Sequence, residues 1–264
     1  MRRRAKSAKI KVMHLGAIAV CVDLPDAAAV AVALSGVDAP FLHCPMPSGP
    51  ANNQTWNEAF FGAAYQEKLP LLVYVTGEPS GARFPSFTIL DGITEGMNAV
   101  LGSGIPSIVL QSAFYLENLH PELFAPLLRS ESKLGYPPVP HDLKMQRTSY
   151  LDEAKLAVEA FARPELAGQA FEIGSSDTLA GAKLASHLSG WLNRDVIFDP
   201  ASREAFCQRV GEALNNPCVV FVLSDLYGSI AALERNVMSV GTATLETTFG
   251  VTLTSLADHI KSWS

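Results

Sequence analysis

Strand-like and helical stretches alternate along most of this 264-residue chain. Short apolar runs rich in β-branched residues are followed by turns, and then by segments whose apolar residues have helical spacing. Such alternation is typical of βα units that build a mainly parallel sheet with helices on both faces. The sequence therefore predicts an α/β fold.

The individual elements follow from these runs. The predicted strands are 17–22, 39–43, 71–75, 107–110, 170–173 and 196–198. The run 17–22 is continuous and apolar, as in a strand buried on both faces. The predicted helices cover 26–34 with Gly36 as the stop, 56–67, a segment ending near Gly102, 151–161, 179–191 capped by Ser176 or Asp177, and most of the remainder. The Pro-rich residues 121–140 predict irregular surface.

Charge and composition exclude several classes of protein. The net charge is −6, and the one basic cluster, Arg2 to Lys6, lies at the terminus, so no nucleic-acid partner is expected. No apolar run is long enough for a membrane span, so no membrane is expected. The run 12–22 after a basic start has the outline of a signal peptide, but Asp23 and Pro25 follow where small residues are required. Four cysteines without a C-x-x-C pair favour a reducing, cytoplasmic location.

Recognisable nucleotide-binding and catalytic motifs are missing. A dinucleotide fold carries a Gly-rich turn after its first strand, and this chain has none near its start. Residues 76–81 have T-G-x-x-x-G spacing, but Glu78 would repel phosphate, which favours an ordinary loop. There is no Y-x-x-x-K, G-x-S-x-G, H-E-x-x-H or P-loop, so catalytic residues are not assigned and no metal is expected. His43 ends a strand where α/β folds place ligands, although a structural histidine is the alternative.

Three stretches together resemble the NmrA-like family of atypical short-chain dehydrogenases/reductases. These are 16–26 with 33–42, then 103–119 with its Phe114-Tyr115-Leu116-Glu117-Asn118 segment, and 171–174 with 178–185. The resemblance implies a Rossmann-like domain over residues 1–175. It also implies a small, mostly helical substrate or partner lobe over residues 176–264.

The departures from this family leave two readings open. In this alignment Met1 falls just after the family's second strand, so the first strand, its glycine turn and the first helix are not in the chain. Either the sequence is a truncated version of a longer protein, or the sheet has closed up and the cofactor role is lost. The lysine that many relatives use before Ser103 is also missing, and Asn98 lies near that position.

The resemblance implies a site at the carboxyl ends of the strands. The cofactor, NADP or NAD, would be held by the residues that end three strands, namely Asp23, His43, Cys44, Pro45, Thr76 and Gly77. The substrate pocket would be lined by Gln111, Ser112, Phe114 and Tyr115, with Asn118 holding the loop. Plain core packing is the alternative for Phe114 and Tyr115.

Three functions remain as hypotheses. The first is hydride transfer from NAD(P)H to a quinone or carbonyl, with a small-molecule substrate. The second is a non-catalytic redox sensor that binds a regulatory protein partner, which the missing tyrosine–lysine pair favours. The third is a truncated product that is stable only with a partner at its open strand edge, and homo-oligomers are a further expectation.

Overall fold

The computed structural model describes residues 16–43, 50–77, 88–120, 124–233 and 237–263. The chain divides into two compact units. Unit 1 comprises residues 1–37 and 50–68, and unit 2 comprises residues 38–49 and 69–264. The domain boundary expected at residue 175 stays a prediction.

Unit 1 contains two helices, α2 (Ala27–Leu34) and α3 (Pro50–Gln66), that pack against each other. The carboxylate of Asp26 caps α2, since its Oδ1 accepts from the amides of Ala28 and Ala29 at 3.0 and 3.1 Å. Gly36 follows with a φ of +73°, a left-handed conformation that ends helices and suits glycine. Both predicted helices are confirmed.

Residues 17–22 form no regular secondary structure, so the predicted strand there is wrong. Ile18 and Val20 are 90% and 68% exposed, in place of the expected burial on two faces. A parallel strand requires hydrogen-bonded neighbours, and no residue in the described ranges pairs with 17–22. An apolar, β-branched run is therefore not sufficient for a strand.

The main sheet belongs to unit 2 and has four strands, all parallel. They are β1 (Phe41–His43), β2 (Leu72–Val75), β3 (Ser107–Ser112) and β8 (Ala170–Ile173), in the order β1-β2-β3-β8. All four lie where the sequence predicts them, with β3 extending two residues further. The mainly parallel sheet is therefore confirmed.

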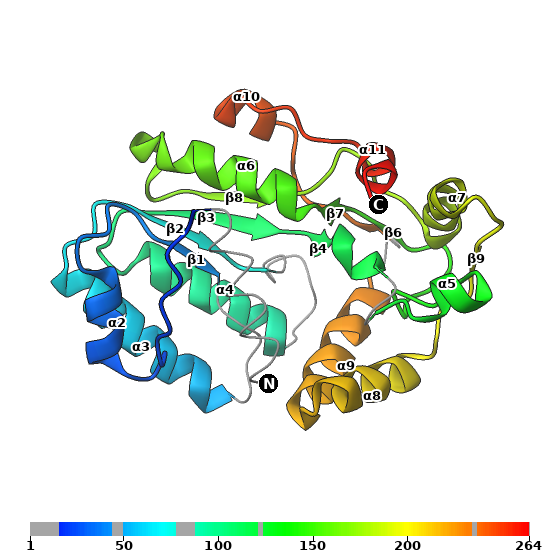
Figure 1. Ribbon diagram of the computed structural model, residues 1–264, viewed down its shortest axis with the longest axis horizontal. Coiled ribbons are helices and arrows are strands. Elements are labelled where there is room, and N and C mark those ends of the chain that lie inside the picture. Colours follow the sequence, from blue (N-terminus) through cyan, green and yellow to red (C-terminus); the bar gives the residue numbers. More distant parts are fainter. Residues whose placement is uncertain (1–15, 44–49, 78–87, 121–123, 234–236, 264) are drawn as a thin grey trace. The chain divides into compact units, whose positions relative to one another are not determined.

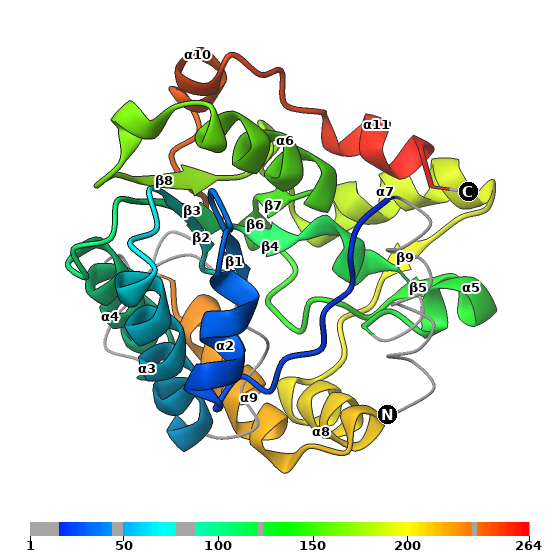
Figure 2. The same cartoon turned by 60° about the vertical axis from the view of Figure 1, so that its left-hand side comes forward.

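Helices cover both faces of this sheet within unit 2 (Figure 1). Helix α4 (Thr88–Leu101) packs on one face, and α6 (Tyr150–Phe161) packs on the other (Figure 2). The short helix α10 (Leu245–Phe249) packs against α6. The core between the sheet, α6 and α10 contains Val73, Val75, Ile108, Leu110, Leu156, Ala160, Ile173 and Phe249.

The rest of unit 2 is a mostly helical lobe with its own hydrophobic core. Its helices are α5 (Leu127–Glu131), α7 (Gly181–Leu192), α8 (Arg203–Leu214), α9 (Pro217–Ala231) and α11 (Leu256–Lys261). Unit 2 also contains two 3-10 turns, η2 (Leu116–Leu119) and η3 (Pro164–Leu166). Three two-stranded pairs are β4 (Phe114–Tyr115) with β7 (Arg147–Thr148), β5 (Lys133–Leu134) with β9 (Ile197–Phe198), and β6 (Lys144–Met145) with β10 (Val237–Met238). No helix in the described residues is both long and apolar enough to cross a bilayer.

Two sequence predictions in this lobe are wrong. Residues 124–140 are not irregular surface, because they include α5, β5 and the fully buried Tyr136. Neither Ser176 nor Asp177 caps α7, whose N-cap is Ala180. The carboxylate of Asp177 instead accepts from the amide of Leu256 at 3.0 Å, and so holds the start of α11.

An aromatic cluster fixes the C-terminal end of unit 2. The indole N–H of Trp191 donates to the carbonyl oxygen of Trp263 at 2.8 Å, and the two ring centroids are 5.3 Å apart, edge to face. The ring of His120 lies 4.5 Å from that of Trp263. Through these contacts α7 and the segment after α11 hold each other in place.

Candidate functional site

The carboxyl ends of β1, β2 and β3 meet at one edge of the sheet. The register pairs His43 with Val75, and Val75 with Leu110, so the three strands end side by side. Thr76 follows β2 and its amide donates to the carbonyl of Leu110 at 3.1 Å. In open parallel sheets this edge is where ligands bind.

His43 and Gly77 lie together at that edge. The His43 side chain is exposed, and its ring centroid is 6.1 Å from that of Tyr115. Gly77 has a φ of +75°, and a Cβ built on it would lie 3.1 Å from Nε2 of His43. Glycine at this position therefore leaves room for the imidazole and for any ligand that reaches it.

We expect Gly77→Ala to weaken any ligand bound at this edge, because the methyl group would displace His43. The left-handed backbone would also cost about 1 kcal/mol of stability. The control is Gly168→Ala, where φ is +89° and nothing lies within 4 Å of the added carbon. Both variants should unfold at similar denaturant concentrations, and only Gly77→Ala should change a ligand titration.

The end of β3 connects to α6 through a buried carboxylate. Oε2 of Glu153 accepts from the hydroxyls of Ser112 and Tyr115, at 2.5 and 2.9 Å. Beside it, the hydroxyl of Thr148 accepts from the amide of Ala113 at 2.9 Å and donates to the carbonyl of Ile173 at 2.8 Å. These bonds fix the hydroxyl of Tyr115 close to the sheet edge.

A second carboxylate and a second tyrosine lie at the start of α6. Oε1 of Glu117 accepts from the amide of Tyr150 at 3.1 Å. Burial raises the pKa of Glu117 more than hydrogen bonds to its own amide and that of Tyr150 lower it. Burial, with the charges of Glu117 and Glu153, also raises the pKa of Tyr150. The Tyr150 ring meets that of Tyr115 edge to face at 4.6 Å, so a neutral phenol lies against the site.

Three buried side-chain atoms have no hydrogen-bond partner in the part of the chain that the structure describes. They are Oε1 of Gln111 at the end of β3, Oε2 of Glu117 in η2, and Nη1 of Arg147 in β7. Leaving a buried polar group unpaired costs about 1–3 kcal/mol, so such atoms are rare in folded proteins. Gln111 lies at the carboxyl end of β3, and Glu117 follows in η2. Arg147 lies in β7, which pairs with β4 directly after β3. This is the end of the sheet at which a ligand would be expected.

The structure brings together some of the predicted site residues. His43, Gly77, Ser112 and Tyr115 occupy neighbouring strand ends or contact one another, while Phe114 packs in the lobe core against Tyr227. Asn118 donates to the hydroxyl of Tyr136 at 3.3 Å. Asp23 is exposed in a turn of unit 1, and Cys44 and Pro45 lie outside the described residues.

Sequence reasoning did not select Glu153, Tyr150 or Arg147 for the site. Glu153 lies 41 residues after Ser112, on a helix with an ordinary amphipathic pattern, so no local motif marks it. Arg147 likewise carries no local signal, because a single charged residue does not show in the sequence whether it is buried.

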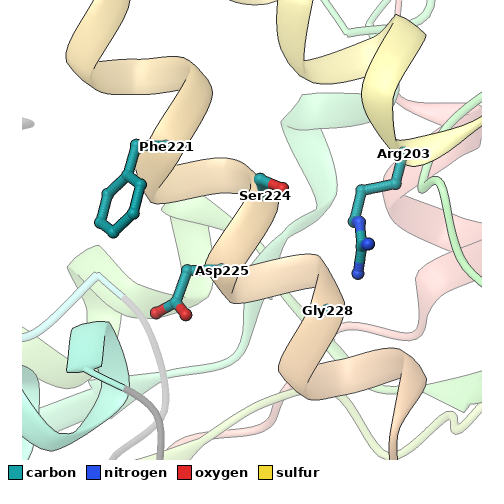
Figure 3. A pocket seen from close by; sticks show the side chains of 5 residues that line it. All are labelled: Arg203, Phe221, Ser224, Asp225 and Gly228. Atoms are coloured by element: carbon teal, nitrogen blue, oxygen red, sulfur yellow. The ribbon is translucent and has the colours of Figure 1, made fainter.

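A shallow pocket of about 280 Å³ lies on the lobe, away from the residues named above. It is lined by Phe221, Ser224, Asp225 and Gly228 of α9 and by Arg203 at the start of α8 (Figure 3). The guanidinium of Arg203 extends over Gly228, where a Cβ would lie 2.7 Å from Nη1. Arg203 and Phe221 are largely exposed, and the pocket adds nothing to the strand-edge site. The described residues contain no cluster of side chains that would hold a metal ion.

Comparison by sequence finds no relative: no family model matches the chain, and no curated protein does. Comparison by structure finds many. A nucleoside-diphosphate-sugar epimerase from Staphylococcus aureus has a TM-score of 0.73 at 17% identity, over 91% of this chain and 82% of that one. An NADPH-dependent quinone oxidoreductase from Escherichia coli, complexed with NADPH, has a TM-score of 0.72 at 20% identity, over 96% and 86%. The triphenylmethane reductase of Citrobacter sp., complexed with NADP(H), has a TM-score of 0.73 at 16% identity, over 96% and 86%.

These neighbours define the fold of the chain. It is the Rossmann-like α/β fold found in NAD(P)-dependent epimerases and reductases, as the parallel sheet and its helices indicate. At identities of 16 to 20% the likeness concerns the fold.

Proposed function

We propose that this chain is an NAD(P)H-dependent reductase of quinones or carbonyls, in the NmrA-like branch of the fold. The observation that carries the proposal is the strand edge formed by His43, Gly77 and Gln111, in a fold shared with a quinone oxidoreductase that binds NADPH. A small-molecule substrate and a cytoplasmic location belong to the same proposal. The Ser103–Asn118 stretch is the part of the sequence that supports the NmrA-like branch.

Several residues at this edge fit a dinucleotide. The buried Oε1 of Gln111 has no partner among the described residues and would accept from an amide such as that of a nicotinamide. Gly77 leaves a space that a Cβ would fill, beside the exposed imidazole of His43. The sequence has no Gly-rich turn for the pyrophosphate, so we expect weaker binding than a complete phosphate cradle gives.

The chemistry divides between cofactor and chain. When bound, NAD(P)H supplies the hydride. The hydrogen bonds from Ser112 and Tyr115 to Glu153 keep the site rigid. The phenol of Tyr150 is protonated at neutral pH and lies against Tyr115, so it is the proposed donor to a reduced carbonyl oxygen. Burial and the nearby carboxylates raise its pKa, which makes it a weaker acid than a free phenol.

Thermal unfolding with NADPH or NADH tests the proposal. A ligand at 100 times its Kd stabilises a folded protein by about 2.7 kcal/mol, which raises the melting temperature measurably. We expect a saturable shift with one dinucleotide, reduced in Gly77→Ala and unchanged in Gly168→Ala. Oxidation of the bound dinucleotide, followed by absorbance over a panel of quinones, then tests turnover.

The outcomes separate the hypotheses. Absence of any shift from a protein that unfolds cooperatively would contradict dinucleotide binding. Saturable binding without turnover of any quinone or carbonyl would instead support the non-catalytic sensor.

A further inference from the structure

Strand β1 forms one open edge of the main sheet. It comes first in the order β1-β2-β3-β8, so among the described residues β2 is its only strand partner. Its side chains are accessible as well, since Phe41 is 44% exposed and His43 is exposed, whereas β3 is buried throughout. An open strand edge presents backbone groups with which another strand can pair.

The register shows which backbone groups of β1 face the open edge. The carbonyl of Pro40 accepts from the amide of Val73 in β2 at 3.1 Å, and Phe41 is the direct partner of Val73. Peptide groups alternate in direction along a strand, so the amides of Phe41 and His43 and the carbonyl of Phe41 point away from β2. The edge therefore offers two donors and an acceptor to an added strand.

Residues 17–22 have the composition of a strand but no strand partner. Along this segment the β-branched Ile18, Val20 and Val22 alternate with small residues. Ile18 and Val20 are 90% and 68% exposed, and no backbone–backbone hydrogen bond joins the segment to any residue that the structure describes. Such a sequence favours an extended, paired conformation, and its apolar side chains are unfavourable in water.

We propose that residues 17–22 of one copy of this chain pair with β1 of a second copy, in a reciprocal exchange. The occupant of the edge comes from a second copy, because within the described chain the segment and the edge stay unpaired with each other. Backbone hydrogen bonds would hold the added strand, and its β-branched side chains would be removed from water. Since each copy carries one segment and one edge, a two-fold dimer satisfies both and leaves no open end. This assembly does not depend on the proposed reductase activity.

Sedimentation of the purified chain between about 1 and 200 μM tests the dimer. We expect a reversible monomer–dimer equilibrium with a Kd on the order of 10 μM, because the pairing surface is small. The double variant Ala19→Pro/Val20→Pro should raise that Kd at least about tenfold, since successive amides point to opposite sides and one of the two lost amides must face β1. Val32→Lys is the control for exposed apolar residues: Val32 is 78% exposed on α2, and its replacement should leave the Kd unchanged.

A complementation experiment distinguishes strand exchange from any other contact between copies. Phe41→Pro removes an amide of the open edge, and the bonds from β1 to β2 remain because that amide points away from β2. Alone, Phe41→Pro and Ala19→Pro/Val20→Pro should each remain monomeric. Mixed in equal amounts they should form a heterodimer, because the intact edge of one variant receives the intact segment of the other. Failure of the two variants to complement each other would overturn the proposal.

Hydrogen exchange of the wild type provides a test that needs no variant. The amides of residues 17–22, and those of Phe41 and His43, should become more protected as the protein concentration rises. Protection that is the same at all concentrations would show pairing within one copy and overturn the exchange. A wild type that stays monomeric up to about 200 μM, or a dimer unchanged by Ala19→Pro/Val20→Pro, would also overturn it. Wild-type assemblies larger than a dimer that the double variant abolishes would reject the reciprocal, closed arrangement.

Discussion

Glu153→Ala is expected to lower the free energy of unfolding by about 3 kcal/mol and to abolish any reductase activity. Two buried hydroxyls, those of Ser112 and Tyr115, would lose their charged acceptor. Hydrogen bonds to charged groups contribute about 1.5–3 kcal/mol each, and their donors would be left unpaired. The Tyr115 ring would lose its fixed position beside His43, which should disturb ligand binding as well as stability. Urea unfolding and the dinucleotide titration measure the two effects.

Glu159→Ala is the matched control on the same helix. Its carboxylate is 38% exposed and pairs with Arg163 one turn further on. Such surface pairs contribute about 0.3–0.5 kcal/mol, so this variant should remain close to the wild type in both measurements. Equal losses in Glu153→Ala and Glu159→Ala would show that the buried network has no special role.

Asp152→Ala is expected to release the C-terminal segment and to cost about 3 kcal/mol at pH 7, the usual scale for breaking a buried ion pair. The carboxylate of Asp152 accepts from the amide of Thr254 at 2.8 Å and contacts Nε2 of His259 at 3.1 Å. Lys155 adds an ion pair at 2.6 Å from the same helix. Hydrogen exchange should show faster exchange in α11, and urea unfolding should show the loss of stability.

The pH dependence gives this prediction a second test. Burial alone would raise the pKa of Asp152, but the bonds from Lys155, Thr254 and His259 together lower it below the usual value. A lowered carboxyl pKa contributes stability above the unfolded-state pKa, and this contribution is lost as the pH falls through the folded-state pKa. The difference between wild type and Asp152→Ala should therefore shrink as the pH falls below about 4. Asp258→Ala removes an exposed carboxylate of α11 whose pKa is also lowered, by hydrogen bonds from Ser255 and Lys261, so it should show a smaller change over the same pH range.

The strands of the sheet could be predicted because each is a run of consecutive apolar residues, as buried strands of a parallel sheet are. Val73, Ile108 and Leu110 are fully buried, and each belongs to an apolar run bounded by turn residues. The strand prediction at 17–22 is wrong because an apolar run alone does not provide a hydrogen-bonded neighbour. That run has the same composition, but a strand also needs a partner, and pairing is not a local property of the sequence.

The candidate site was predictable at the strand ends and not beyond them. His43 and Ser112 follow from the general rule that ligands bind at the carboxyl edge of a parallel sheet. Glu153 and Arg147 are brought to that region by tertiary packing, and a single charged residue has no periodicity that would show its burial. That Nη1 of Arg147 has no hydrogen-bond partner among the described residues is visible only in the folded structure.

The aromatic cluster at the C-terminal end has a practical consequence for spectroscopy. The chain has three tryptophans, of which Trp191 and Trp263 form an edge-to-face pair in unit 2 and Trp56 belongs to unit 1. Two indoles held this closely should give a strong near-ultraviolet circular dichroism signal that depends on their mutual orientation. The difference in emission between the wild type and Trp56→Phe isolates the signal of Trp56, and loss of the circular dichroism band before that signal changes would show that the two units unfold in separate steps.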